Sequence, residues 1–190
     1  MDTKKSFVLP LLLAGSLHSQ AAVLEFDLSP AGTTAATGLS PMNEVIPGSS
    51  TGSGNETGNG IIFNTTTLTL SLSLAYGSSA SFTDLTGPAF AWFLHGPATP
   101  AETAPVVFDL SPFHTFASDH ARGGTIIGSI SYTPGQAADL LAGLDYINIY
   151  TPANLGGEIR GQLVVVPEPD MIVLLIIGGL ILFGLQRIRG

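Results

Sequence analysis

Hydrophobic and polar residues alternate along much of the middle of this chain, which is the pattern of a β-strand with one buried face. The clearest case is TLTLSLSLAY, residues 67–76, where leucines alternate with threonine or serine. Such a strand packs one face on a core and leaves the other in water. Further runs of strand character are 23–28, 80–85, 89–95, 105–110, 124–132, 145–150 and 158–166. Since glycine, proline and asparagine separate most of them, we predict an all-β fold, an antiparallel β-sandwich or Greek-key barrel.

Two segments depart from this alternation. The first, TPGQAADLLAGL, places Thr133 as N-cap, Pro134 at the first helical position and Gln136 where a capping box needs it. Gly143 is the expected stop, so we predict one short helix that covers an end of the sandwich. The second segment, residues 31–60, is rich in Gly, Ser, Thr and Asn. It predicts a long flexible loop within the same domain.

The segment DYINIYTPANLGGEIRGQL, residues 145–163, predicts a hairpin whose loop is TPANLGG. On its second strand Glu158, Arg160 and Gln162 alternate with Ile159, Gly161 and Leu163, so the three polar side chains form one row. Cross-strand polar pairs stabilise a sheet by ~0.2–1 kcal/mol each.

This polar row has two interpretations. In the structural one, it faces Asn148 and Tyr150 across the hairpin, and Glu44 pairs with Arg160 across the sandwich. In the functional one, Arg160, Tyr150 and His95 form a site for a small ligand. We favour the structural interpretation, because polar rows on sheets are commonly structural or solvated.

The N-terminal segment MDTKKSFVLPLLLAGSLHSQA, residues 1–21, has the layout of a secretory signal peptide. Lys4 and Lys5 precede an apolar stretch, and small residues follow it. We predict a signal helix that is removed by signal peptidase between Ala21 and Ala22. Residues 22–166 are then the exported domain.

The C-terminal segment carries an uninterrupted apolar run, residues 171–185. At ~1.5 Å per residue it is about 22 Å long, somewhat short of the ~30 Å hydrocarbon core. Arg187 and Arg189 follow the run, and basic residues beside a membrane segment stay in the cytoplasm. Because the N-terminal signal exports the middle of the chain, both ends give the same orientation, and we predict a membrane helix over 171–185.

Charge and cysteine content exclude some functions. The whole chain has six Lys and Arg, a formal net charge of -8 and no cysteine. Because six Lys and Arg side chains cannot neutralise a row of phosphates, we expect no nucleic-acid partner. The lack of cysteine excludes disulfides and thiolate metal sites.

Candidate chemistry in the exported domain is sparse. His114, Asp119 and His120 lie in one turn-rich segment and, with His95, are the candidates for a metal site, but their spacing matches no common ligand set. The sequence has no nucleophile elbow, phosphate loop or HExxH motif. We therefore predict no catalytic residue, no metal and no cofactor.

Pro167, Glu168 and Pro169, the apolar run and the tail with Arg187 and Arg189 come in the order of a known signal. Residues 167–190 resemble the PEP-CTERM sorting signal of Gram-negative bacteria. The resemblance implies an exosortase-type transpeptidase of the inner membrane that recognises the motif and removes the tail. It also implies a host that makes exopolysaccharide. The alternative is a plain C-terminal membrane anchor.

Four fragments of the exported domain resemble the CHRD domain, a module that is repeated in chordin and found singly in many bacterial exported proteins. They are LSPMNEVIP (39–47), AWFLHGPA (91–98), PVVFDL (105–110) and residues 139–163. The resemblance implies an all-β domain used outside the cell. The family pattern commonly carries H-x-H before Gly-Pro and a further His before Thr-Pro. Here Phe93 stands two residues before His95, and Tyr150 stands at the last position, so that set of histidines is incomplete.

These observations predict an exported binding or structural protein of the cell surface or extracellular matrix in a Gram-negative bacterium. Its expected partners are signal peptidase, exosortase, the inner membrane before processing, and exopolysaccharide or other surface proteins. One alternative is a metal-dependent redox enzyme on a superoxide-dismutase-like sandwich. Another is a matrix adhesin that uses its acidic surface with calcium.

Overall fold

A computed structural model describes residues 23–117 and 121–166 of the chain. The predicted signal peptide with its Ala21–Ala22 cleavage site, the motif Pro167-Glu168-Pro169 and the predicted membrane helix 171–185 lie outside these residues. Within the two described ranges, no helix has the length and apolar character needed to span a membrane.

The described residues form a nine-stranded antiparallel sheet with one short α-helix, which confirms the predicted all-β, antiparallel class. The strand order is β5-β4-β8-β9-β1-β2-β3-β7-β6. The strands are β1 (Val23–Leu28), β2 (Gly54–Asn64), β3 (Thr69–Tyr76), β4 (Ala91–His95), β5 (Val106–Asp109), β6 (His114–Phe116), β7 (Gly124–Ser131), β8 (Tyr146–Thr151) and β9 (Asn154–Val165).

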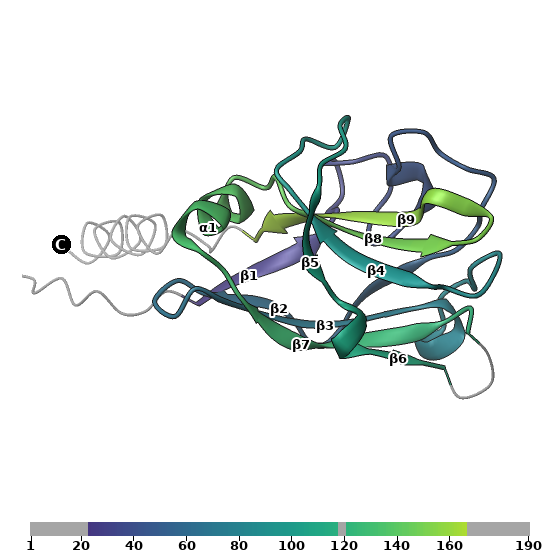
Figure 1. Ribbon diagram of the computed structural model, residues 1–190, viewed down its shortest axis with the longest axis horizontal. Helices are drawn as coiled ribbons and strands as arrows, with labels where there is room; N and C mark the ends of the chain where they lie inside the picture. Colours follow the sequence, from purple (N-terminus) through teal and green to yellow (C-terminus); the bar gives the residue numbers. More distant parts are fainter. Residues whose placement is uncertain (1–22, 118–120, 167–190) are drawn as a thin grey trace, which may run out of the picture.

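The sheet curls on itself into a half-barrel (Figure 1). Its two outermost strands, β5 and β6, are consecutive in the chain and are joined by the 3-10 turn η3 (Ser111–Phe113). The indole of Trp92 on β4 stacks on the imidazole of His114 on β6, with ring centroids 3.7 Å apart. The two ends of the sheet therefore face each other and enclose the core.

The core follows the alternation read from the sequence. Leu70, Leu72 and Leu74 on β3 point inward and are buried, while Ser71 points outward. Inward residues of other strands complete the core: Phe26, Leu28, Ile61, Phe63, Trp92, Leu94, Ile126, Ile130, Ile147, Ile149, Ile159 and Leu163. Burying these side chains on one concave face is what curls the sheet around them.

The helix α1 (Pro134–Leu141) begins as predicted. Thr133 and Gln136 form the full capping box, each side chain bonded to the backbone of the other. The helix ends at Leu141 with Ala142 as its C-cap, and Gly143 follows with φ of 72°, a left-handed conformation that glycine adopts without a Cβ clash. Ala137 and Leu140 bury the inner face of α1 against the sheet.

The predicted loop 31–60 is wrong at its C-terminal end, because β2 begins at Gly54. The stretch GNETGNG has no apolar alternation, so the sequence carries no strand signal there. Pairing with β3 makes it a strand, with a bulge between Glu56 and Ile61. Gly58 and Gly60 have φ of 56° and 69°, so the bulge uses backbone conformations that favour glycine.

Other boundaries also differ from the prediction. Residues 80–85 form no strand, since a 3-10 turn η2 (Gly77–Ala80) and irregular backbone occupy this region. The loop TPANLGG is wrong too, because Thr151 already pairs with Asn154 and leaves only two residues in the turn. The short strand β6 lies in a region with no alternation long enough to predict it.

Candidate functional site

The polar row of the β8–β9 hairpin lies on the convex side of the sheet, opposite the core. Tyr146 pairs with Gln162 and Asn148 with Arg160 across the hairpin. We call the outward side chains of these two strands the roofed face: Tyr146, Asn148, Tyr150, Glu158, Arg160 and Gln162. The name reflects their cover: Tyr150 is half-buried and the other five are buried. Three connections contact this face, residues 29–53, residues 77–90 and residues 96–105.

Arg160 holds the β4–β5 connection, residues 96–105, against the sheet. The side chain is only 1% exposed, and its guanidinium carbon lies 3.6 Å from the centroid of the Tyr146 ring. Nη1 donates to the carbonyl of Glu102 at 2.8 Å, and Nη2 donates to the carbonyl of Thr99 at 3.1 Å. Nη2 also donates to Oε1 of Gln162 at 3.1 Å. These contacts occupy the charged group with the protein's own backbone.

Glu158 holds different segments and does not contact Arg160. Its carboxylate accepts hydrogen bonds from the backbone and hydroxyl of Thr86 at 2.6 and 2.8 Å, and from the amide of Asn154 at 3.0 Å. The hydroxyls of Ser50 and Thr151 also donate to it. Burial acts to raise the pKa of Glu158, but these donors outweigh it and hold the pKa below its usual value. The carboxylate is therefore ionised and fully occupied.

Glu44 reaches the roofed face from the β1–β2 connection, directly after the 3-10 turn η1 (Pro41–Asn43). This turn is fixed to β9 by backbone hydrogen bonds between Ser40 and Arg160 in both directions, 3.0 and 3.1 Å long. The Asn43 amide adds a bond of 3.1 Å to the carbonyl of Arg160. The expected contact of Glu44 with residue 160 is thus made by its neighbours, through the backbone.

The Glu44 carboxyl itself meets Asn148. Nδ2 of Asn148 donates to Oε2 at 3.4 Å, whereas Oε1 of Glu44 and Oδ1 of Asn148 are buried without a partner. The structure records no ion pair between Glu44 and Arg160, so the predicted direct pair is wrong. Burial raises the pKa of Glu44 to about 7, against the opposing effects of the Arg160 charge and the Asn148 amide.

His95 lies at the edge of the roofed face, on β4. Its Nδ1 lies 2.9 Å from the carbonyl of Ala104 and its Nε2 lies 2.9 Å from the hydroxyl of Tyr150. A carbonyl only accepts, so Nδ1 carries the proton and Nε2 accepts from Tyr150. Burial lowers the pKa of His95, in agreement with a neutral ring.

Positions 93, 95 and 150, where the family resemblance would place histidines, do come together on this face. The Phe93 ring lies 6.0 Å from His95 and 5.6 Å from Tyr150. Here they supply one imidazole, one phenyl and one phenol. Among residues 23–117 and 121–166 there is no group of three metal-binding side chains. His114 lies on β6, bonded to the Tyr76 hydroxyl at 2.8 Å, and Asp119 and His120 fall outside the described residues.

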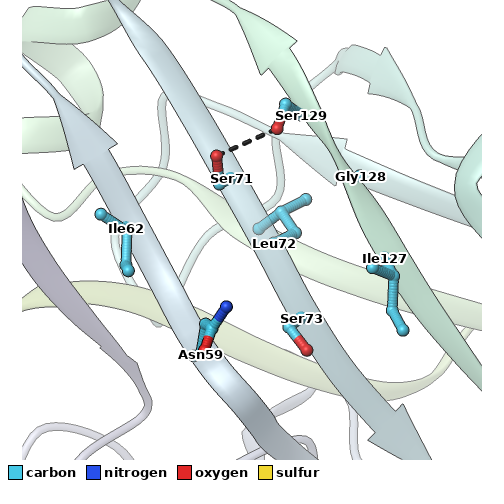
Figure 2. Close-up of a pocket in the computed structure, with 9 residues that line it drawn as sticks. Asn59, Ile62, Ser71, Leu72, Ser73, Ile127, Gly128 and Ser129 are labelled. Carbon is cyan, nitrogen blue, oxygen red and sulfur yellow. Dashed lines mark hydrogen bonds between the residues drawn. The ribbon is translucent and has the colours of Figure 1, made fainter.

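A second polar face, which the sequence interpretation treated only as solvated, lies over β2, β3 and β7. An open groove there has a volume of about 380 Å³. Figure 2 shows the residues that line it. Cross-strand pairing places Ser71 between Ile62 and Ser129, and Ser73 beside Ile127. Asn59 of the β2 bulge lies at one end. We call this surface the open groove.

Within residues 23–117 and 121–166, no connection covers the open groove. Asn59, Ser71, Ile127 and Ser129 are exposed, and the isoleucine is 61% accessible. The hydroxyls of Ser71 and Ser129 share a hydrogen bond of 3.0 Å across β3 and β7. The lining contains no charged side chain. The sequence signal that could have found this surface is the run of serines on the outward side of 67–76, combined with a glycine-rich bulge beside it.

Comparison with known proteins identifies the family. The model of the CHRD domain matches residues 35–163, well over half of the chain, so this chain belongs to the CHRD domain family. Searches of curated proteins and of solved structures each found no match.

Proposed function

We propose that this CHRD-domain protein is an exported binding or structural protein of the bacterial cell surface or extracellular matrix, without catalytic activity. One observation carries the proposal: its two polar faces are used differently. The charged groups of the roofed face are engaged in holding connections onto the sheet, whereas the open groove presents uncharged groups to solvent. A surface of this kind favours contact with a partner over chemistry.

The roofed face lacks the arrangement that a reaction centre needs. Glu158 receives donors on both oxygens, and Arg160 donates to backbone carbonyls and Gln162. Neither group is within reach of a substrate unless a connection moves. A general acid or base must reach the proton that it transfers, within ~2.6–3.2 Å or through one water. The contacts of these two side chains support the structural interpretation of the polar row.

Export and sorting complete the proposal. Residues 1–21 serve as the signal peptide, and residues 167–190 serve as a PEP-CTERM signal read by an exosortase. The chain is an inner-membrane intermediate before it reaches the surface or matrix. Within this proposal the curled sheet acts as a two-layer β-sandwich, which the contact between Trp92 and His114 across its open side supports.

The export proposal is tested by expressing the full chain in a Gram-negative host with and without an exosortase. N-terminal sequencing of the recovered protein is expected to begin at Ala22, and its mass is expected to show loss of the tail only with the exosortase. A variant with Pro167→Ala and Pro169→Ala is the control and should keep its tail. Recovery of a chain that begins at Met1 would refute export.

The metal-dependent redox alternative is separated by elemental analysis of the same purified protein. Our proposal expects copper, zinc and manganese far below one atom per chain, because His95 has no second imidazole beside it on the roofed face. Stoichiometric metal would overturn the non-catalytic reading.

A further inference from the structure

The open groove combines apolar and hydroxyl-bearing side chains in a diagonal pattern. Ile62 lies beside Ser71 on one cross-strand row, and Ile127 lies beside Ser73 on the next. Residues two apart on a strand are separated by ~6.6–6.8 Å, and neighbouring strands by ~4.8 Å. The two isoleucines therefore flank the serines of β3 at opposite corners (Figure 2).

Several polar groups in the groove have unused hydrogen-bonding capacity. Asn59 is exposed, and its side chain makes no hydrogen bond within the described residues. The Ser73 hydroxyl has a single long contact, 3.5 Å to Thr57. Ser71 and Ser129 share one bond and keep further acceptor capacity. Hydroxyl and amide groups both donate and accept, so they match a ligand whose own groups do both.

The charge distribution selects among such ligands. The exported domain has eleven acidic residues, no lysine and two arginines. Arg160 is buried, and Arg122 lies 3.7 Å from Asp84. The acidic domain repels an anionic polymer. It attracts a cationic one, but the lining of the groove has no charged side chain that could form an ion pair with it there. A neutral, hydroxyl-rich ligand fits both conditions.

The shape of the groove suits a chain better than an enclosed small molecule. It is open along the sheet, and the bulge of β2 with Gly58 and Gly60 forms one wall. A sugar ring has apolar C–H faces and hydroxyls at its edge. The isoleucines can contact such faces while Asn59 and the serines bond the hydroxyls. A strand of sugars could pass through without any connection having to open.

We propose that the open groove binds a neutral polysaccharide strand, with Ile62 and Ile127 against the apolar sugar faces and Asn59, Ser71, Ser73 and Ser129 on the hydroxyls. This inference rests on the proposed surface-binding function and names its ligand class. It assigns no role to the roofed face, which keeps the structural role described above.

The test is electrophoresis of the full chain, in mild detergent, through native gels that contain hydroxyethyl cellulose, dextran or alginate. We expect retardation by at least one of the two neutral polymers and none by alginate. Ile127→Asp should weaken the neutral interaction roughly tenfold or more, because it places a charge at the contact. Ser131→Asp adds the same charge to the same face of β7, beyond the groove, and should change binding less than roughly twofold.

Circular dichroism melting of each variant shows whether it folds. If Ile127→Asp does not fold, Ile127→Ser takes its place with the same expectation. The groove assignment would be overturned if the variants at residue 127 were retarded as strongly as the wild type. Retardation by alginate alone would also overturn it. A third contrary result would be self-association that depends on residue 127 without any polymer binding, because the groove would then bind a second copy of the chain. The sequencing of the processed termini tests the proposed function separately, so the two failures are distinguishable.

Discussion

The roofed face and the open groove are both polar rows on the convex side of one sheet, yet they have opposite environments. On β9, Arg160 and Gln162 are 1% and 2% exposed, while on β7 the outward Ile127 is 61% exposed. The strands alternate in the same way in both places. The difference comes from the connections that the structure describes, which cross the roofed face and do not cross the open groove. Outward position on a strand therefore does not determine whether a polar side chain is structural or available.

Among these variants, Arg160→Ala should cause the largest loss of stability. The substitution leaves the carbonyls of Thr99 and Glu102 without their donor and removes the stacking on Tyr146. Loss of a buried charged donor should lower the free energy of unfolding by about 3–5 kcal/mol. Arg122→Ala is the control, since the 3.7 Å pair with Asp84 is partly exposed and worth less than ~1 kcal/mol. Urea unfolding measures both, and equal effects would remove the distinction between the faces.

A glycine pair near the start of β9 tests the packing of the roofed face. Gly157 has φ of 115°, and a Cβ there would lie 2.4 Å from Oδ1 of Asn148 and 2.5 Å from Oε1 of Glu44. Gly157→Ala should therefore cost about 2–4 kcal/mol through backbone strain and overlap. A Cβ on Gly156 would meet nothing within 4 Å. Gly156→Ala should consequently melt close to wild type, and a similar loss in both variants would contradict the close packing.

The third effect is a dependence of stability on pH. Because the folded-state pKa of Glu44 is raised from 4.5 to about 7, the folded protein binds more protons than the unfolded chain between these values. Stability from this group is thus present below pH 4.5 and is lost as pH rises to about 7. The buried Asp145, whose pKa burial also raises to about 7, acts in the same direction.

Glu44→Gln isolates the first contribution. The difference between the unfolding curves of wild type and Glu44→Gln should change by about 1–3 kcal/mol over pH 4.5 to 7. Burial lowers the pKa of His114 to about 4, which acts in the opposite sense below pH 6.5, so the difference between the two proteins is the quantity to measure. A difference that stays constant with pH would show that folding does not raise the pKa of Glu44.

The smallest expected effect lies in the open groove. Ser71→Ala removes only an exposed hydroxyl contact with Ser129, and Ile127→Ser removes a side chain that is mostly in water. Each should change the free energy of unfolding by no more than about 0.5 kcal/mol, as is usual for surface positions. Thermal melting checks this. A large loss in either variant would mean that this face also has a structural role.

Much of the sheet could be predicted from local pattern. β1 has the predicted bounds, and β3, β7 and the capping box of α1 lie close to the predicted positions. In each case the residue types alone set the preference. The pattern failed where tertiary pairing overrides composition. Residues 54–60 become part of β2 through their pairing with β3, although nothing in GNETGNG favours a strand.

The sequence by itself determined the alternation that separates core from convex side, and therefore the class of the fold and the row of Glu158, Arg160 and Gln162. Only the tertiary structure decided what that row does. Arg160 finds backbone carbonyls of residues 99 and 102, and Glu158 finds Ser50 and Thr86, none of them neighbours in the chain. Carbonyls are present at every residue, so such partners leave no trace in side-chain composition. Whether a polar row is covered depends on the path of distant irregular connections, which strand periodicity does not encode.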